Sequence, residues 1–139
     1  MIRGCYTAII TPMLADGAID SEGLRRLVEY QSENHIDGIV AVGTTGESPT
    51  LDWREHMRVI ARTNEFSSGK TKVIAGTGAN STEESIHGTL EAIDLGVETI
   101  LLVDPYYNGP SSLEIRKEYY EPIASKFPEA KFVPYIIPG

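Results

Sequence analysis

Short apolar runs alternate with longer amphipathic stretches along the whole sequence, and this alternation constrains the fold more than any other feature. Five mostly apolar runs recur about every 30 residues, the length of one strand–helix unit: residues 5–10, 38–42, 72–75, 99–103 and 131–135. Runs without polar alternation are typical of strands buried on both faces of a parallel sheet. The stretches between them carry apolar residues at helical spacing. The sequence therefore predicts an α/β fold.

Residues that can cap a helix stand near the start of each amphipathic stretch. The predicted N-caps are Asp20, Thr50, Ser81 in a capping box with Glu84, and Ser111 in a capping box with Glu114. The apolar faces predicted for the first three helices are Leu24, Leu27, Val28 and Tyr30; Met57, Ile60 and Ala61; and Ile86, Leu90 and Ile93. Pro122 has no N–H, so it should kink the last helix or end its regular part.

Polar, glycine-rich segments follow several of the predicted strands, always at the carboxyl end. A doubly wound sheet gathers its site at one crevice, whereas a (β/α)8 barrel draws site residues from many strand ends. Because polar, glycine-rich segments follow several strands here, the sequence favours the barrel. A complete barrel takes about 250 residues. We therefore expect one partial domain over residues 1–139, a (β/α)8 TIM-barrel type truncated after its fifth strand.

Composition excludes several classes of protein. The 139 residues carry a net charge of −8, which argues against binding nucleic acid through phosphate contacts. No apolar run approaches the roughly 20 residues that span a membrane. Cys5 is the only cysteine, so no intrachain disulfide can form, and its place at a strand start predicts a small buried residue. The N-terminus lacks a signal-peptide pattern. We expect a cytoplasmic protein with no metal and no cofactor.

Two glycines bracket two threonines in residues 43–48, Gly-Thr-Thr-Gly-Glu-Ser, directly after the second predicted strand. Glycine allows the backbone to turn sharply there. Adjacent hydroxyls and free backbone N–H groups at a strand end suit a small carboxylate. No Gly-Lys-Ser/Thr follows, so a P-loop is excluded. On these residues alone, a plain glycine-rich turn into a helix remains the alternative.

This segment, with Glu55, resembles the first signature of the dihydrodipicolinate synthase / N-acetylneuraminate lyase family, class I aldolases built on a (β/α)8 barrel. Gly-Thr-Gly-Ala-Asn at 76–80 and Pro-Tyr-Tyr-Asn at 105–108 resemble the synthase branch. The resemblance runs from about Gly4 to Gly139. It implies a lyase of lysine biosynthesis, in which a lysine on the sixth strand forms a Schiff base with pyruvate. That intermediate then condenses with aspartate semialdehyde.

The resemblance also implies site residues. Thr45 and Thr44 would bind the carboxylate of pyruvate or a similar 2-oxo acid. Thr44, Tyr107 and Tyr135 would form a hydroxyl chain that relays protons, with Tyr107 reaching into a neighbouring subunit. A hydroxyl can donate and accept at once, so such a chain carries a proton without net charge. From the residues alone, the threonines could instead cap turns, and the tyrosines could be surface or core residues.

The sequence departs from the family pattern in its last segment. Ile136 stands where the family usually has a polar residue. The site arginine and the Schiff-base lysine expected next do not occur in these residues. Lys131 lies at the start of a strand, whereas barrel chemistry lies at the strand ends. We therefore expect this chain alone to be inactive.

A second set of residues resembles the allosteric lysine pocket that regulated members of the synthase branch form at a dimer interface. The set consists of Ser48, Trp53, His56, Asn80, Glu84 and Tyr106. A carboxylate, an imidazole, an amide and an aromatic ring suit an amino acid that bears an ammonium group. The alternatives are capping for Glu84 and packing for Trp53 and His56.

Other functions remain open at this point. Within enzymes, the rivals are an N-acetylneuraminate lyase or a 2-keto-3-deoxy sugar acid aldolase, and Asn80 with residues 105–108 favours the synthase over both. A different class is a non-catalytic half-subunit or truncated product that binds small carboxylates. Five strands would leave two free edges and a half-covered inner face, formed by Ile9, Val40, Val42, Ile74, Leu101 and Val133. We therefore expect a homo-oligomer or a complementing chain.

Overall fold

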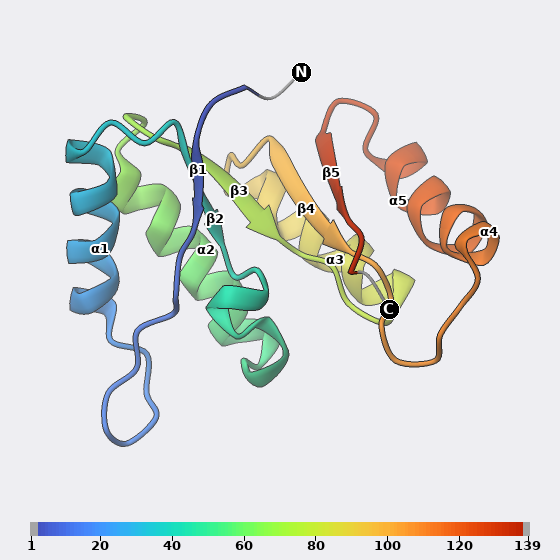
Figure 1. Cartoon of the computed structure of the whole chain (residues 1–139), viewed down its shortest axis with the longest axis horizontal. Helices are drawn as coiled ribbons and strands as arrows, with labels where there is room; N and C mark the ends of the chain where they lie inside the picture. Colours follow the sequence, from blue (N-terminus) through green and yellow to red (C-terminus); the bar gives the residue numbers. More distant parts are fainter. Residues whose placement is uncertain (1–2, 138–139) are drawn as a thin grey trace. The chain divides into compact units, whose positions relative to one another are not determined.

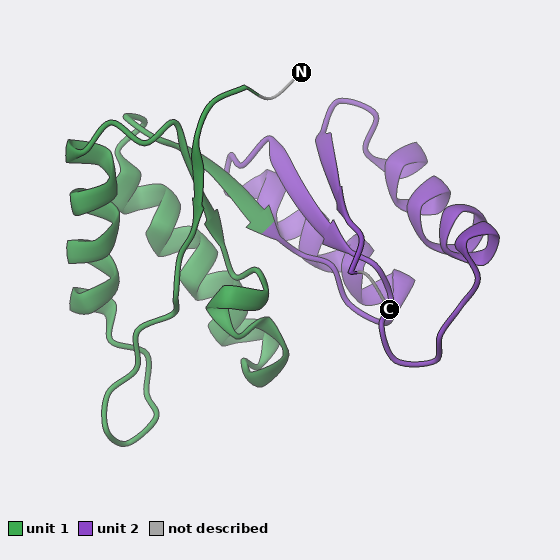
Figure 2. Ribbon diagram, viewed as in Figure 1, with its two compact units in different colours: residues 1–75 green, residues 76–139 purple. Residues whose placement is uncertain are grey.

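The computed structural model describes residues 3–137 and divides into two compact units, Met1–Ala75 and Gly76–Gly139 (Figure 2). Strands and helices alternate along the chain as predicted (Figure 1). The strands are β1 (Tyr6–Ala8), β2 (Gly38–Ala41), β3 (Lys72–Gly76), β4 (Thr99–Val103) and β5 (Lys131–Tyr135). The helices are α1 (Ser21–Glu33), α2 (Trp53–Ser67), α3 (Thr82–Asp94), α4 (Ser112–Glu114) and α5 (Glu121–Lys126), with 3₁₀ turns η1 (Thr44–Gly46) and η2 (Ser48–Thr50) and a π-helix η3 (Ile115–Tyr120).

In the first unit, β1, β2 and β3 pair in parallel, with Thr7 opposite Ile39 and Ile39 opposite Val73. Helices α1 and α2 pack against each other. Ile39 and Val73 are buried, while Val40, whose side chain points to the opposite face of the sheet, is only half-buried. On that opposite face, Ile74, the cross-strand partner of Val40, is buried, so both faces of these strands contribute to the core.

The predicted start of α1 is confirmed and that of α2 is wrong. The Asp20 carboxylate accepts a hydrogen bond from the Gly23 N–H at 2.8 Å and caps α1. Thr50 caps nothing, because its hydroxyl donates to the Glu47 carbonyl at 2.9 Å and closes η2. Asp52 caps α2 instead, in a complete capping box with Glu55.

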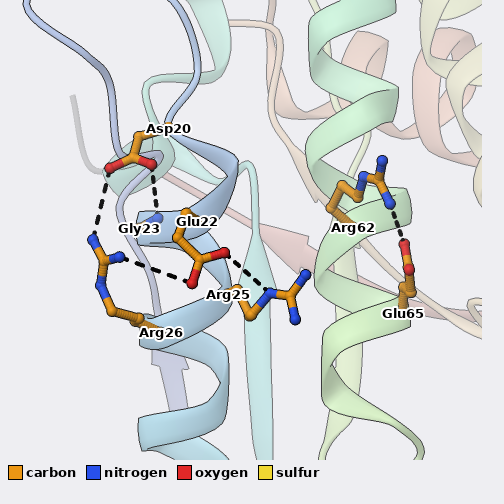
Figure 3. A network of polar contacts seen from close by, with 7 residues as sticks. All are labelled: Asp20, Glu22, Gly23, Arg25, Arg26, Arg62 and Glu65. Atoms are coloured by element: carbon orange, nitrogen blue, oxygen red, sulfur yellow. Dashed lines mark hydrogen bonds and ion pairs between the residues drawn. The ribbon is translucent and has the colours of Figure 1, made fainter.

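Surface ion pairs run along α1 and α2 (Figure 3). Asp20 both caps α1 and lies 3.9 Å from the Arg26 guanidinium. The other pairs are Arg25 with Glu22 at 3.3 Å, Arg26 with Glu22 at 4.0 Å and Arg62 with Glu65 at 2.6 Å. Exposed pairs of this kind contribute about 0–1 kcal/mol each. The two helices are therefore held mainly by their buried contacts.

In the second unit, β4 and β5 pair in parallel, and burial alternates along β4. Ile100 and Leu102 are buried, whereas Leu101 between them is half-buried. Pro134 lies within β5 opposite Leu102 and does not prevent that strand from forming. Of the six inner-face residues named from the sequence, three are buried (Ile9, Val42 and Ile74) and three are half-buried (Val40, Leu101 and Val133).

The helix that contains Pro122 is irregular, but its irregular part lies before the proline, and Pro122 does not end the regular part as predicted. The π-helix η3 directly precedes α5, in which Pro122 stands near the start. Because Pro122 has no N–H, it cannot donate to the Glu118 carbonyl one helical turn earlier. That carbonyl accepts a hydrogen bond from the Thr82 hydroxyl at 2.8 Å instead. The break in the helix is thus compensated by a residue at the start of α3.

The predicted apolar face of α3 is wrong. Its buried residues are Ser85, Gly88, Thr89 and Ala92, while Leu90 is 44% exposed. Small side chains let α3 approach closely, and its two buried hydroxyls both find hydrogen-bond partners. Two further expectations fail: Tyr30 is exposed on α1, and Cys5 is exposed because β1 begins only at Tyr6.

Among the described residues, Thr63 on α2 is fully buried and its hydroxyl oxygen has no hydrogen-bond partner. We predict that Thr63→Val raises the free energy of unfolding by about 1 kcal/mol, because the variant buries no unpaired hydroxyl. The matched control is Thr89→Val on α3, which leaves the Thr77 hydroxyl without its partner and should lower stability. Urea unfolding measures both. Equal losses of stability in the two variants would contradict the assignment of the Thr63 hydroxyl as unpaired.

Candidate active site

The segment after β2 presents two threonines to solvent. Thr44 and Thr45 are exposed, while Gly43 and Gly46 on either side are buried. The Gly46 N–H donates to the Gly43 carbonyl at 3.0 Å, and the Glu47 N–H donates to the Thr44 carbonyl at 3.1 Å. The N–H groups of Thr44 and Thr45 open the turn, where helical geometry supplies no acceptor. Two hydroxyls and two backbone N–H groups are therefore available to a carboxylate at this turn.

Left-handed backbone conformations lie on both sides of the two threonines. Val42 has φ 54° and Glu47 has φ 58°. For a β-branched residue such as Val42 this conformation is strained, at a cost of about 1–3 kcal/mol. Val42 is also fully buried, so packing around it holds the strained backbone in place. The conformation of the turn is thus imposed by its surroundings and does not follow from local preference.

Thr11 supports this turn through a hydrogen bond, and no sequence pattern predicts that contact. Thr11 follows β1, is buried, and donates its hydroxyl proton to the Gly46 carbonyl at 2.7 Å. The two residues are 35 positions apart, so no local pattern links them. The only signal is a polar residue between the first apolar run and Pro12.

A second cluster lies in the other unit, around Asn80. The Asn80 carbonyl oxygen accepts hydrogen bonds from the Tyr106 N–H at 2.8 Å and the Tyr107 N–H at 3.1 Å. One side chain therefore fixes the backbone of both tyrosines. The Tyr107 side chain remains 80% exposed. A cavity of about 250 Å³ opens beside Asn80 and Tyr107, with Pro105 and Glu118 among its lining residues.

Buried polar residues hold Asn80's segment in place. A side chain at Gly78 would lie 2.4 Å from the Val103 nitrogen, so only glycine fits there. The Ala79 N–H donates to the Ser85 hydroxyl at 2.9 Å, and that hydroxyl lies 3.1 Å from the Tyr119 hydroxyl. Ser85 and Tyr119 are positioning residues that sequence patterns do not reveal, because their partners lie in other elements.

Tyr120 and Tyr135 are tied to the end of β4. The Tyr120 hydroxyl bonds to the Asp104 carboxylate and to the Leu102 carbonyl. Burial raises the pKa of Tyr120 above its ordinary value, and the hydrogen bond to Asp104 and its negative charge raise that pKa further. The Asp104 N–H donates to the Tyr135 carbonyl at 3.0 Å, which fixes the Tyr135 backbone.

The residues of the predicted lysine pocket fall in both units. In the first, Ser48 is half-buried, and the rings of Trp53 and His56 lie 4.7 Å apart with His56 only 3% exposed. In the second, Glu84 is exposed on the first turn of α3. Its N–H donates to the Ser81 hydroxyl, but the return bond of the predicted capping box is not formed in the described chain.

All five lysines of the sequence are exposed. Lys131 stands at the start of β5 and pairs with Glu98 at 2.7 Å, which lowers the pKa of the Glu98 carboxyl. Within residues 3–137, no group of three His, Cys, Asp or Glu side chains is placed to hold a metal ion. No helix in this range is long and apolar enough to cross a membrane.

The whole sequence, residues 1–139, matches the Dihydrodipicolinate synthetase family. It is 54% identical over 111 residues to 4-hydroxy-tetrahydrodipicolinate synthase of Nitrosococcus oceani, covering 80% of this chain and 38% of that protein. The dihydrodipicolinate synthase of Acinetobacter baumannii, solved with pyruvate, is 45% identical with a TM-score of 0.95, covering 100% of this chain and 47% of that one.

A second solved structure, the synthase of Cyanidioschyzon merolae with lysine bound, is 38% identical with a TM-score of 0.93, over 98% of this chain and 46% of that one. These matches confirm the predicted TIM-barrel type of fold. The chain spans less than half the length of each of these three relatives.

The Asn80 contacts predict a local effect on the tyrosine segment. Asn80→Ala should speed amide hydrogen exchange at Tyr106 and Tyr107 about tenfold, because both N–H groups lose their acceptor. Asn80→Asp keeps an acceptor oxygen and should retain the protection. NMR measures the exchange, with the Leu102 amide of β4 as an internal reference. Unchanged exchange in Asn80→Ala would show that this side chain does not hold the segment.

Proposed function

Because this chain belongs to the Dihydrodipicolinate synthetase family, we propose that it carries the pyruvate-binding and proton-relay residues of a 4-hydroxy-tetrahydrodipicolinate synthase. Such an enzyme is a Schiff-base lyase that condenses pyruvate with aspartate semialdehyde. Thr44 and Thr45 bind the pyruvate carboxylate. Thr44, Tyr107 and Tyr135 pass protons between the reacting groups and solvent. The same carboxylate site would serve a related 2-oxo acid.

The exposed turn at Thr44 and Thr45 is the observation that supports this proposal most strongly. Its hydroxyl and N–H donors suit a carboxylate, since charge-assisted hydrogen bonds are short and strong. Pyruvate is bound in the solved Acinetobacter baumannii synthase, and all of this chain matches 47% of that protein. The turn is also held in one conformation by the buried Val42 and Thr11, so little ordering is needed on binding.

The relay role fits the contrast between two groups of tyrosines. Tyr107 and Tyr135 are exposed, so their hydroxyls are free to turn between donor and acceptor. Tyr119 and Tyr120 are committed to Ser85 and Asp104, and burial raises the pKa of both. We assign the relay to the first group and a structural role to the second.

We assign the Schiff-base amine to a lysine outside residues 1–139. A nucleophilic amine needs a buried, apolar setting that favours its neutral form. The exposed positions of all five lysines supply no such setting. The ring of Tyr107 would contact another subunit, since tyrosine is enriched at protein interfaces and this ring has little cover within the described chain, and the relay role needs only that its hydroxyl stays free to turn. A homo-oligomer or a complementing chain therefore belongs to the proposal.

Replacing Thr45 tests the carboxylate site. The unmodified chain should bind pyruvate at about the millimolar level, the affinity that a few hydrogen bonds supply. Thr45→Val removes one donor at nearly constant volume and should weaken binding about tenfold. Thr99→Val, at the start of β4, is the control and should bind as the unmodified chain does. Calorimetry measures the three affinities, and equal binding by all three would refute the carboxylate role of Thr45.

We propose in addition that free lysine binds at the set formed by Ser48, Trp53, His56, Asn80, Glu84 and Tyr106. Lysine is bound in the solved Cyanidioschyzon merolae synthase. The Asn80 carbonyl oxygen is already used by Tyr106 and Tyr107, so its NH₂ group is the part left to contact a ligand. The exposed Glu84 carboxylate supplies a charge opposite to that of an ammonium group.

Thermal unfolding with and without lysine tests this second site. Lysine should raise the melting temperature of the unmodified chain, since a ligand that binds only the folded state stabilises it. Glu84→Gln should abolish that rise. The matched control is Glu83→Gln, the neighbouring carboxylate on the same first turn of α3, which should keep it. Only the lysine-induced shift within each protein is compared. A full shift in Glu84→Gln would remove Glu84 from the site.

A further inference from the structure

The hydroxyl of Thr11 is a buried link between two loops of the first unit. It donates to the Gly46 carbonyl at 2.7 Å, and Thr11 is only 4% exposed. Gly46 is buried as well. If a buried carbonyl loses its hydrogen-bond donor, water cannot replace that donor, so the folded state is destabilised. The bond therefore governs where the Gly46 carbonyl can point.

The space between the two loops is tight around Gly46. A Cβ atom at Gly46 would lie 3.3 Å from the Thr11 hydroxyl oxygen and 3.3 Å from the Ile9 carbonyl oxygen. The segment after β1 is itself fixed, because the Ile9 N–H donates to the Val40 carbonyl at 3.2 Å. Thr11 thus offers its hydroxyl from a rigid position.

The two peptide groups on either side of the Gly46 Cα atom in turn bond to the start of the threonine turn. The Gly46 N–H donates to the Gly43 carbonyl, and the next N–H, of Glu47, donates to the Thr44 carbonyl. Rotation of the peptide between Gly46 and Glu47 would disturb the second of these bonds directly. The Thr11 hydroxyl is therefore linked, through the peptide between Gly46 and Glu47, to the Thr44 carbonyl.

We propose that Thr11 is a positioning residue for the carboxylate-binding turn, acting through the Gly46 carbonyl without touching the ligand. The inference rests on the proposed binding of pyruvate at Thr44 and Thr45. Thr11 fixes the directions in which the donors of this turn point. Its loss should weaken binding of a small 2-oxo acid even though every ligand-contacting residue is still present.

Three variants of the 139-residue chain separate positioning from simple destabilisation. Thr11→Val removes the hydroxyl at nearly constant volume, and Thr11→Ser keeps it. Thr71→Val is the matched control, because Thr71 is also 4% exposed in the same unit and makes one hydroxyl bond, to Ser32 at 2.8 Å. Thr71 precedes β3, at the opposite end of the strands from the turn.

Two readouts are measured on each variant: pyruvate affinity by calorimetry, and the amide chemical shifts of Thr44 and Thr45 in ligand-free protein. Thr11→Val should weaken pyruvate binding about fivefold and move both amide shifts, because the turn would have to be ordered on binding once the Thr11 bond is lost. Thr11→Ser should restore both, and Thr71→Val should change neither.

Two results would overturn the inference. One is a Thr11→Val protein whose Thr44 and Thr45 shifts match those of the unmodified chain. The other is a loss of pyruvate affinity in Thr71→Val as large as that in Thr11→Val. If the unmodified chain binds no pyruvate, the proposed function fails. The amide shifts then still decide whether Thr11 holds the turn.

Discussion

Parallel strand pairing decides which loops of this protein can touch. Parallel neighbours run in one direction, so the segments after them emerge at the same edge of the sheet. In the first unit, this brings Thr11, after β1, to Gly46, after β2. In the second, it brings the Asp104 N–H, after β4, to the carbonyl of Tyr135 at the end of β5. Residues far apart in the sequence become partners as a direct consequence of this pairing.

A division of labour among hydroxyl groups follows from that arrangement. The hydroxyls of Thr11, Thr77 and Ser85 are buried and paired beneath the loops. Those of Thr44, Thr45 and Tyr107 are exposed. A binding site works best when its ligand-contacting groups are held by a second layer with fixed partners. The same residue types are therefore buried as structural support or exposed where we propose that they donate to a ligand, according to their depth.

The sequence predicts most of the elements because their signals are local. Apolar runs locate the five strands, Asp20 and Ser111 mark two helix starts, and Pro122 locates the irregular helix. The misses have non-local causes. The small, polar face of α3 is buried against partners from other elements, among them Tyr119 and Thr77, which satisfy its hydroxyl groups. The support from Thr11 depends on a partner 35 residues away, which no spacing rule detects.

We propose above all that the turn at Thr44 and Thr45 is a carboxylate site held in its binding conformation before the ligand arrives. A crystal structure of the protein grown with pyruvate tests it most directly. The account predicts a carboxylate within about 2.7–3.2 Å of the Thr44 and Thr45 donors, with the backbone of the turn unmoved. Pyruvate bound elsewhere, with only water at these donors, would contradict it.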